Sequence, residues 1–296
     1  MNLRVRSEHY VKRDKYSNDL TAKLGPTAAR TMPASVAVWG IKGIGKTELV
    51  MQWAYDNRHY YDTIRVFNGR TAQDLKTSIE DFYDYLNKIR DDTLTRVASS
   101  GTENDKSQSI KSWFANEKDW LVILLNASID QGYEMTDYFP QDGSGHRIVI
   151  GDSRDLLQFA RAAIEVREMT TSEAVDMLLT VSDRREMSLE QLEWAPLVVE
   201  KLGNIPLFIQ ITAKYILSHG DSLSQYLQLQ QEQIERNTLP IPTNVRAEAF
   251  AGWQMTMTKL EEQPNSILLL NVFAFLDGLN ISDTLYVMII IDAHNR

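Results

Sequence analysis

The chain has 296 residues, of which 43% are hydrophobic and 24% are charged, which suffices for a buried core and about two or three domains. It contains no cysteine, which excludes disulfides, thiolate metal sites and cysteine nucleophiles and fits a reducing, cytoplasmic location. The net charge of −9 argues against a nucleic-acid-binding chain, and no apolar run reaches the roughly 18 residues of a membrane-spanning helix.

The first 34 residues form a lead-in. Met1 to Arg6 is charged and no apolar stretch follows it, so we expect no secretory signal peptide. Tyr10-Val11-Lys12-Arg13-Asp14, judged by residue type alone, is a charged N-terminal segment.

A phosphate-binding loop follows. The apolar run Ser35–Trp39 predicts a buried strand, and Thr47–Tyr55 contains good helix formers without Gly or Pro. The residues between them match the pattern G-x-x-x-x-G-K-[ST] completely, and strand, loop and helix occur in the order that this motif requires. The expected nucleotide contacts are Gly40, Ile41, Lys42, Gly43, Ile44, Gly45, Lys46, Thr47 and Glu48.

The residue types of the loop suit a nucleoside triphosphate with Mg²⁺. Gly43 and Gly45 let backbone N–H groups turn towards phosphate oxygens, and the following helix adds its positive end. Lys46 is expected to meet the β- and γ-phosphates, and the Thr47 hydroxyl to bind Mg²⁺. Lys42 is also explained as a solvated loop residue. The structural alternative is a glycine-rich turn without a ligand.

The polar stretch Ser99–Ser107 is expected to be a loop. Two further strands are predicted after it. One strand begins at Trp120 and leads through Leu125 into Asn126 and Ala127, and the other, Arg147–Ile150, ends before Gly151 and Asp152. We therefore expect a parallel α/β sheet with flanking helices, spanning about Ser35 to Arg154, in a domain of residues 35–157.

Helices dominate the rest of the pattern. Thr171–Leu179 has helical apolar spacing with a Ser-Glu start signal, and Pro206 suits the first turn of a helix that continues through Phe208–Leu217. Trp253–Leu260 and Leu268–Leu276 also have the spacing of helical core positions.

These segments, in this order, resemble the NB-ARC type of STAND NTPase, in particular the fungal NOD-like receptors, from about Tyr10 to Tyr286. The resemblance implies a P-loop NTPase domain, a helical subdomain over residues 158–245 and a partial winged-helix domain over 246–296. It also implies that a complete winged helix and its ADP-sensing His-Asp motif are missing from this chain.

Further site residues come from the same resemblance. Tyr10 to Asp14 is similar to the family's entry motif near the adenine, which adds Val11 and Arg13, although Lys12 replaces the usual Gly. Arg154 matches the arginine that senses the γ-phosphate, and Pro206 matches the proline that closes the pocket near the base. The alternatives are a salt bridge from Arg154 to Asp152 or Asp155, and a simple helix-start proline.

One family motif is damaged. Leu125 stands where the Mg²⁺-binding Asp of the second strand belongs, and Ser128 and Ile129 replace two acids, so hydrolysis loses its expected metal support. Asp130 is interpreted as a surface acid. The family topology places the strand before Asp152 between the other two, which brings Asp152 within reach of Mg²⁺; Asp152→Ala is then expected to weaken Mg²⁺-dependent nucleotide binding, and Asp130→Ala not to.

The expected function is an ADP/ATP-dependent signalling switch with Mg²⁺ as a second cofactor and weak or absent hydrolysis. The resemblance implies self-association on activation, effector and ligand-sensing repeat domains outside this chain, and a role in fungal self/non-self recognition or cell death. No nucleic acid or membrane partner is expected. The alternatives are a pseudo-NTPase oligomerisation scaffold and, in third place, an active P-loop ATPase or kinase.

Overall fold

The structure is a computed structural model, and it describes residues 10–25, 34–89, 103–131, 138–139, 145–184 and 188–236, with residues 251–252, 254–255 and 257–258. The chain forms two compact units, Met1–Glu173 and Ala174–Arg296, which are described separately as the first unit and the second unit. Of the expected winged-helix segments, 268–276 lies outside the described residues and 253–260 lies inside them only in part.

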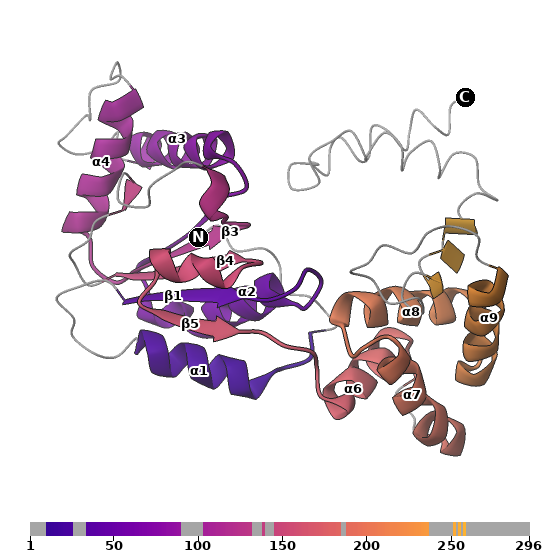
Figure 1. The fold of residues 1–296 in the computed structure, drawn as a ribbon. Helices are drawn as coiled ribbons and strands as arrows, with labels where there is room; N and C mark the ends of the chain where they lie inside the picture. Colours follow the sequence, from indigo (N-terminus) through magenta and orange to yellow (C-terminus); the bar gives the residue numbers. More distant parts are fainter. Residues whose placement is uncertain are drawn as a thin grey trace. The chain divides into compact units, whose positions relative to one another are not determined.

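The first unit contains a five-stranded parallel sheet with the order β2-β3-β4-β1-β5 (Figure 1). The α/β fold expected from the sequence is confirmed, and β4 lies between β1 and β3 as the family topology requires. The strands are β1 Ala34–Trp39, β2 Thr63–Asn68, β3 Trp120–Leu125, β4 His146–Gly151 and β5 Ala162–Glu165.

The sequence pattern does not indicate the edge strand β5. The expected end of the sheet near Arg154 is therefore wrong, because the sheet continues to Glu165. β5 pairs with β1 in parallel, with Val36 opposite Ala162 and Trp39 opposite Glu165. Four residues with two alanines carry little strand signal by themselves, because β propensity comes mainly from packing against neighbours. Pairing with the buried β1 supplies that packing.

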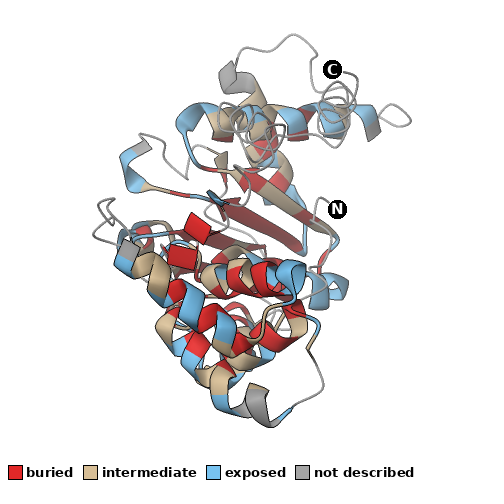
Figure 2. Ribbon diagram, turned by 90° about the vertical axis from the view of Figure 1, so that its right-hand side faces the viewer, coloured by how far each residue is buried: buried red, intermediate tan, exposed pale blue. Residues whose placement is uncertain are grey.

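Both faces of the sheet are covered by helices, which is why the inner strands β1 and β3 are almost continuously buried. On one face, α3 Ala72–Ile89 and α4 Glu103–Asn116 pack on an aromatic cluster around Trp120, whose indole N–H donates to the carbonyl of Phe114 at 2.8 Å. Figure 2 shows the buried strands beneath partly exposed helices. The loop expected over Ser99–Ser107 is wrong from Glu103 onward, since α4 begins there.

The opposite face carries α1 Asp14–Leu24 and α2 Lys46–Asp56, with α1 beside β1 and β5 (Figure 1). Trp53 of α2 is buried and donates its indole N–H to Thr21 of α1 at 2.9 Å. Leu20 and Leu24 give α1 its buried stripe. The lead-in therefore contains a helix that is part of the first unit. Among the described residues of this unit there are also short 3₁₀ segments, η1 Arg58–Tyr60, η3 Ile129–Gln131 and η4 Arg154–Phe159.

The helices after the sheet are α6 Thr171–Val181, α7 Leu189–Lys201, α8 Pro206–His219 and α9 Leu223–Arg236. The start signal of α6 is Thr170 with Glu173, in place of the expected Ser172: Thr170 N–H donates to the Glu173 carboxylate, and Glu173 N–H donates to the Thr170 hydroxyl. No helix within the described ranges is both long and apolar enough to cross a membrane.

Candidate functional site

The loop between β1 and α2 has the geometry of a phosphate cradle. Gly43 and Gly45 adopt φ values of 79° and 91°, in the left-handed region where a side chain is strained. Gly45 is the N-cap of α2 and offers no side chain to the first turn, so the N–H groups there keep their capacity for an anion.

Lys46 is folded into this loop, with a side chain that is only 9% exposed. Its ammonium donates to the carbonyls of Gly40 and Ile41 at 2.7 and 2.9 Å, and to Oδ1 of Asp152 at 2.9 Å. Three contacts use all three donors of a lysine. The positive charge is therefore held at the centre of the loop.

Asp152 reaches Lys46 because β4 is the neighbour of β1. Trp39, the last residue of β1, lies opposite Gly151, so the next residue of each strand is at the same edge of the sheet. The second carboxylate oxygen of Asp152 lies 3.8 Å from the ammonium of Lys42, which is 89% exposed. The Asp152 side chain is half exposed, which leaves it open to a ligand in the loop.

Gly151 is needed at the end of β4 because another segment crosses it. A Cβ at this position would lie 2.3 Å from the carbonyl oxygen of Ala127 and 2.6 Å from Cδ1 of Leu156. The Ala127 N–H donates to Ile150 at 2.8 Å, which fixes the chain leaving β3 over β4. This crossing explains why residue 151 is a glycine.

Gly151→Ala is expected to lower the free energy of unfolding by about 1–3 kcal/mol, since the new methyl group overlaps backbone that cannot yield without moving β3 or β4. Urea denaturation followed by circular dichroism measures it. Gly220→Ala is the comparison, because a Cβ at Gly220 would meet no described atom within 4 Å and only the φ of 73° opposes a side chain, at about 1 kcal/mol. A smaller loss for Gly151→Ala than for Gly220→Ala would contradict the tight crossing.

The residues at the end of β3, from Leu125 to Ala127, carry no carboxylate. Leu125 is buried at 7% exposure, and Asn126 turns the chain with a φ of 55° while its amide donates to Asn68 at 3.4 Å. Asp130 lies in η3 and is exposed. The apolar side chain of Leu125 cannot bind a cation, so the loss seen in the sequence persists in three dimensions.

Arg154 begins η4 and is exposed. Within the described ranges, no ion pair joins it to Asp152 or Asp155, so the salt bridge considered as its alternative role is absent there. Ser153 instead donates its hydroxyl to the Asp155 carboxylate at 2.8 Å. The role of Arg154 towards the γ-phosphate stays a prediction.

Arg13 is buried at 5% exposure and connects three segments of the first unit. Its guanidinium donates to the carbonyl of Ile44 in the loop at 3.3 Å, and to those of Arg167 and Glu168 after β5 at 2.6 and 2.9 Å. Its Nε lies 3.8 Å from the carboxylate of Glu173. Within this charged N-terminal segment, Arg13 is thus a buried residue that tethers the back of the phosphate loop.

The residues just before Arg13 lie against α2. Burial raises the pKa of the Tyr10 phenol, a backbone hydrogen bond from Arg13 lowers it, and the acids Asp56 and Glu48 raise it further. Val11 is half-buried. This segment is therefore near enough to α2 to sense acids at both of its ends, and its contact with an adenine stays a prediction.

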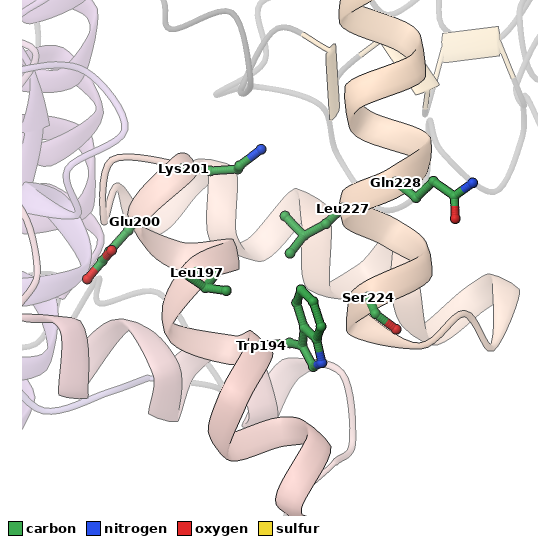
Figure 3. Close-up of a pocket in the computed structure, with 7 residues that line it drawn as sticks. All are labelled: Trp194, Leu197, Glu200, Lys201, Ser224, Leu227 and Gln228. Carbon is green, nitrogen blue, oxygen red and sulfur yellow. The ribbon is translucent and has the colours of Figure 1, made fainter.

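Pro206 belongs to the second unit, where it is the first residue of α8 after the N-cap Ile205. The second unit also has a surface pocket between α7 and α9, which the sequence does not indicate (Figure 3). No local motif marks it, because its walls come from two helices. It is lined by Trp194, Leu197, Glu200, Lys201, Ser224, Leu227 and Gln228.

The residues of the loop fit a nucleotide with Mg²⁺. Gly40 approaches the chain after β5 so closely that a Cβ would lie 2.4 Å from the carbonyl oxygen of Val166, which keeps the loop compact. Lys46 and the start of α2 offer positive charge to phosphates. The Thr47 hydroxyl and the Asp152 carboxylate are hard oxygen donors of the kind Mg²⁺ prefers. In the part of the chain that is described, no group of three or more His, Asp or Glu side chains is placed to hold a metal by itself.

No family model and no curated protein sequence matches the chain. Among solved structures, it is similar to Drosophila ORC bound to DNA, with a TM-score of 0.52 and 13% identity over 80% of this chain and 67% of that one. A STAND protein with a tetratricopeptide repeat sensor from Pyrococcus horikoshii gives a TM-score of 0.48 and 15% identity, over 78% of this chain and 34% of that one. The RuvB Holliday junction branch migration motor of Thermotoga maritima gives 0.44 and 12%, over 78% and 72%.

At these identities the likeness extends to the fold alone, and the chain spans about a third of the Pyrococcus protein. The strand order, the glycine loop and the buried Lys46 agree with it. The chain therefore has the α/β fold of P-loop NTPases, followed by a helical region.

Proposed function

We propose that this chain is a nucleotide-dependent switch that binds ADP and ATP at the loop of residues 40–47. The observation that carries the proposal is the placement of Lys46. The buried Lys46 places its ammonium in a loop whose Gly43 and Gly45 have left-handed backbone conformations. The loop leads into the start of α2, which no side chain caps. Such a site suits phosphate oxygens, because backbone donors, helix dipole and lysine charge converge there.

Different residues would bind the phosphates and the base of the nucleotide. Backbone N–H groups from Gly43 to Thr47 would surround the β-phosphate, and Lys46 would exchange its carbonyl contacts for phosphate oxygens. Arg154 would meet the γ-phosphate, while Val11 and Pro206 would lie near the base, as the family resemblance implies. Mg²⁺, when bound, would neutralise phosphate charge.

The switch is proposed to hydrolyse ATP weakly or not at all. The end of β3 carries the buried Leu125 where the family has an acid, so the usual carboxylate support for a metal-assisted attack of water is lacking at that strand. ATP and ADP can still bias a conformational equilibrium, because only ATP has a γ-phosphate to contact. Self-association in the ATP state is the proposed output.

The proposed cellular role follows the family resemblance of the sequence. Fungal NOD-like receptors couple such a switch to self/non-self recognition and cell death, with effector and sensor repeats in further domains. We propose the same role for this chain.

The test is the nucleotide content and assembly of the purified chain. Protein is denatured, the released nucleotide is identified and quantified by chromatography, and size is measured by light scattering with Mg²⁺ and either ADP or a non-hydrolysable ATP analogue. We expect about one ADP or ATP per chain and a larger particle with the ATP analogue only.

Two outcomes would replace the proposal. A chain that carries no nucleotide and takes up none would be a pseudo-NTPase scaffold. Steady release of phosphate from ATP with Mg²⁺ would identify an active ATPase, the third alternative from the sequence.

A further inference from the structure

We infer that Asp152 takes the place of the missing β3 acid and acts as the carboxylate partner of nucleotide-bound Mg²⁺. The inference rests on the proposed function, since it concerns the same loop. Asp152 is also predicted to oppose nucleotide binding when Mg²⁺ is absent, which gives the inference a sign that can be measured.

Asp152 lies next to the phosphate loop, where the end of β3 supplies no acid. The end of β3 offers Leu125 and Asn126, and neither is a carboxylate. The end of β4 is one strand closer to β1, and there Asp152 lies 2.9 Å from the lysine that must meet the phosphates. A carboxylate so close to this ammonium is also near any phosphate that the ammonium binds.

The charge of Asp152 has opposite effects on a nucleotide with and without Mg²⁺. Phosphate and carboxylate carry the same charge sign, so a nucleotide without a metal must displace Asp152 from Lys46 and then tolerate its negative charge. A divalent cation reverses this, because it is attracted to both groups, and Mg²⁺ commonly binds through one or two carboxylates together with phosphates. Asp152 therefore couples Mg²⁺ binding to nucleotide binding.

The Asp152 carboxylate is accessible to a ligand in the loop. The Asp152 side chain is 50% exposed and its second oxygen lies 3.8 Å from the solvated Lys42, so it is not locked in a core. The backbone that carries it is fixed, because Gly151 is pressed against Ala127 and Ile150 accepts the Ala127 N–H. A half-exposed carboxylate on a fixed strand end has room to exchange Lys46 for a metal.

The test compares ADP dissociation constants with Mg²⁺ and with EDTA, measured by isothermal titration calorimetry on the whole chain. The quantity of interest is the ratio of the EDTA value to the Mg²⁺ value. For Asp152→Asn we expect ADP to bind about threefold more tightly in EDTA and the ratio to fall roughly tenfold. Asp152→Glu, which keeps the charge, should retain most of the ratio.

Asp130→Asn is the matched control, since it removes one negative charge from an exposed position of the β3 exit. Its ratio should equal that of the wild type. Thermal unfolding of each variant checks that the fold is kept.

The outcomes separate the two proposals. If Asp152→Asn raises ADP affinity equally with and without Mg²⁺, Asp152 only pairs with Lys46 and the metal role is overturned. If the wild-type ratio is one, the metal role fails while nucleotide binding stands. If the wild type binds no ADP in either buffer, the proposed function itself fails.

Discussion

Lys46→Ala is expected to weaken the binding of ADP and of ATP about 100-fold or more in the presence of Mg²⁺. The Lys46 side chain is 9% exposed and its ammonium makes three contacts inside the loop, so a bound phosphate would meet a largely desolvated charge. Desolvated ion pairs are the ones whose truncation has a large cost, because no water can replace the lost partner well.

Lys42→Ala is the control for this prediction. It removes the same charge from the same loop, but from a side chain that is 89% exposed, so the change in affinity should stay within about threefold. Calorimetric titration with ADP and ATP measures both variants. Equal losses for the two would mean that the loop attracts nucleotide by its net charge, and that the buried position of Lys46 is irrelevant.

The Lys46→Ala variant should keep its fold and lose about 1–3 kcal/mol of the free energy of unfolding. The substitution frees Asp152, which is half exposed and can be hydrated, but the carbonyls of Gly40 and Ile41 lose a donor inside the loop. Thermal unfolding without nucleotide provides the check. A collapse of the fold would make the affinity loss uninformative, in which case Lys46→Met, which keeps the length of the side chain, replaces it.

Arg13→Ala is expected to lower the free energy of unfolding by about 3 kcal/mol. It removes hydrogen bonds to the carbonyls of Ile44, Arg167 and Glu168 and a contact with Glu173. These groups are buried or partly buried, and they would be left without a cationic donor. ADP affinity should fall as well, because the Ile44 carbonyl is part of the loop.

Arg13→Lys should recover little of this loss, since an ammonium cannot donate in the planar fork by which a guanidinium reaches separate carbonyls. The matched control is Arg167→Ala: Arg167 pairs with Glu165 at 2.6 Å, but its side chain is 70% exposed, so solvent screens the pair and little stability should be lost. Urea denaturation of all three variants compares them. A loss for Arg13→Ala no larger than for Arg167→Ala would show that the tether contributes little.

The phosphate loop and the helix that follows it were predictable because their signals are local. Left-handed glycines, a lysine at a fixed spacing and a strand pattern before them all lie within residues 35–55. Pro206 at the first position of α8 is local in the same sense, since proline lacks the N–H that an interior position needs. The loss at Leu125 could also be seen in the sequence, because an apolar residue interrupts a motif of acids.

Two other elements were misjudged because packing decides them. The polar residues from Glu103 onward look like a loop, but Ile110 and Phe114 give α4 a buried face against the sheet. The short strand β5 exists because β1 has a free edge to pair with. Local composition says little about either, since propensity is weak compared with burial.

The chemistry of the loop follows from a short stretch of residues, because the motif brings its own backbone geometry and charge. How distant residues reach the loop depends on the packing of the whole first unit. Asp152 lies 106 positions from Lys46, and Arg13 lies 154 positions from its acceptor Arg167. Both contacts exist because β4 and β5 flank β1, and the order of strands in a sheet follows from long-range packing that no short window of sequence contains.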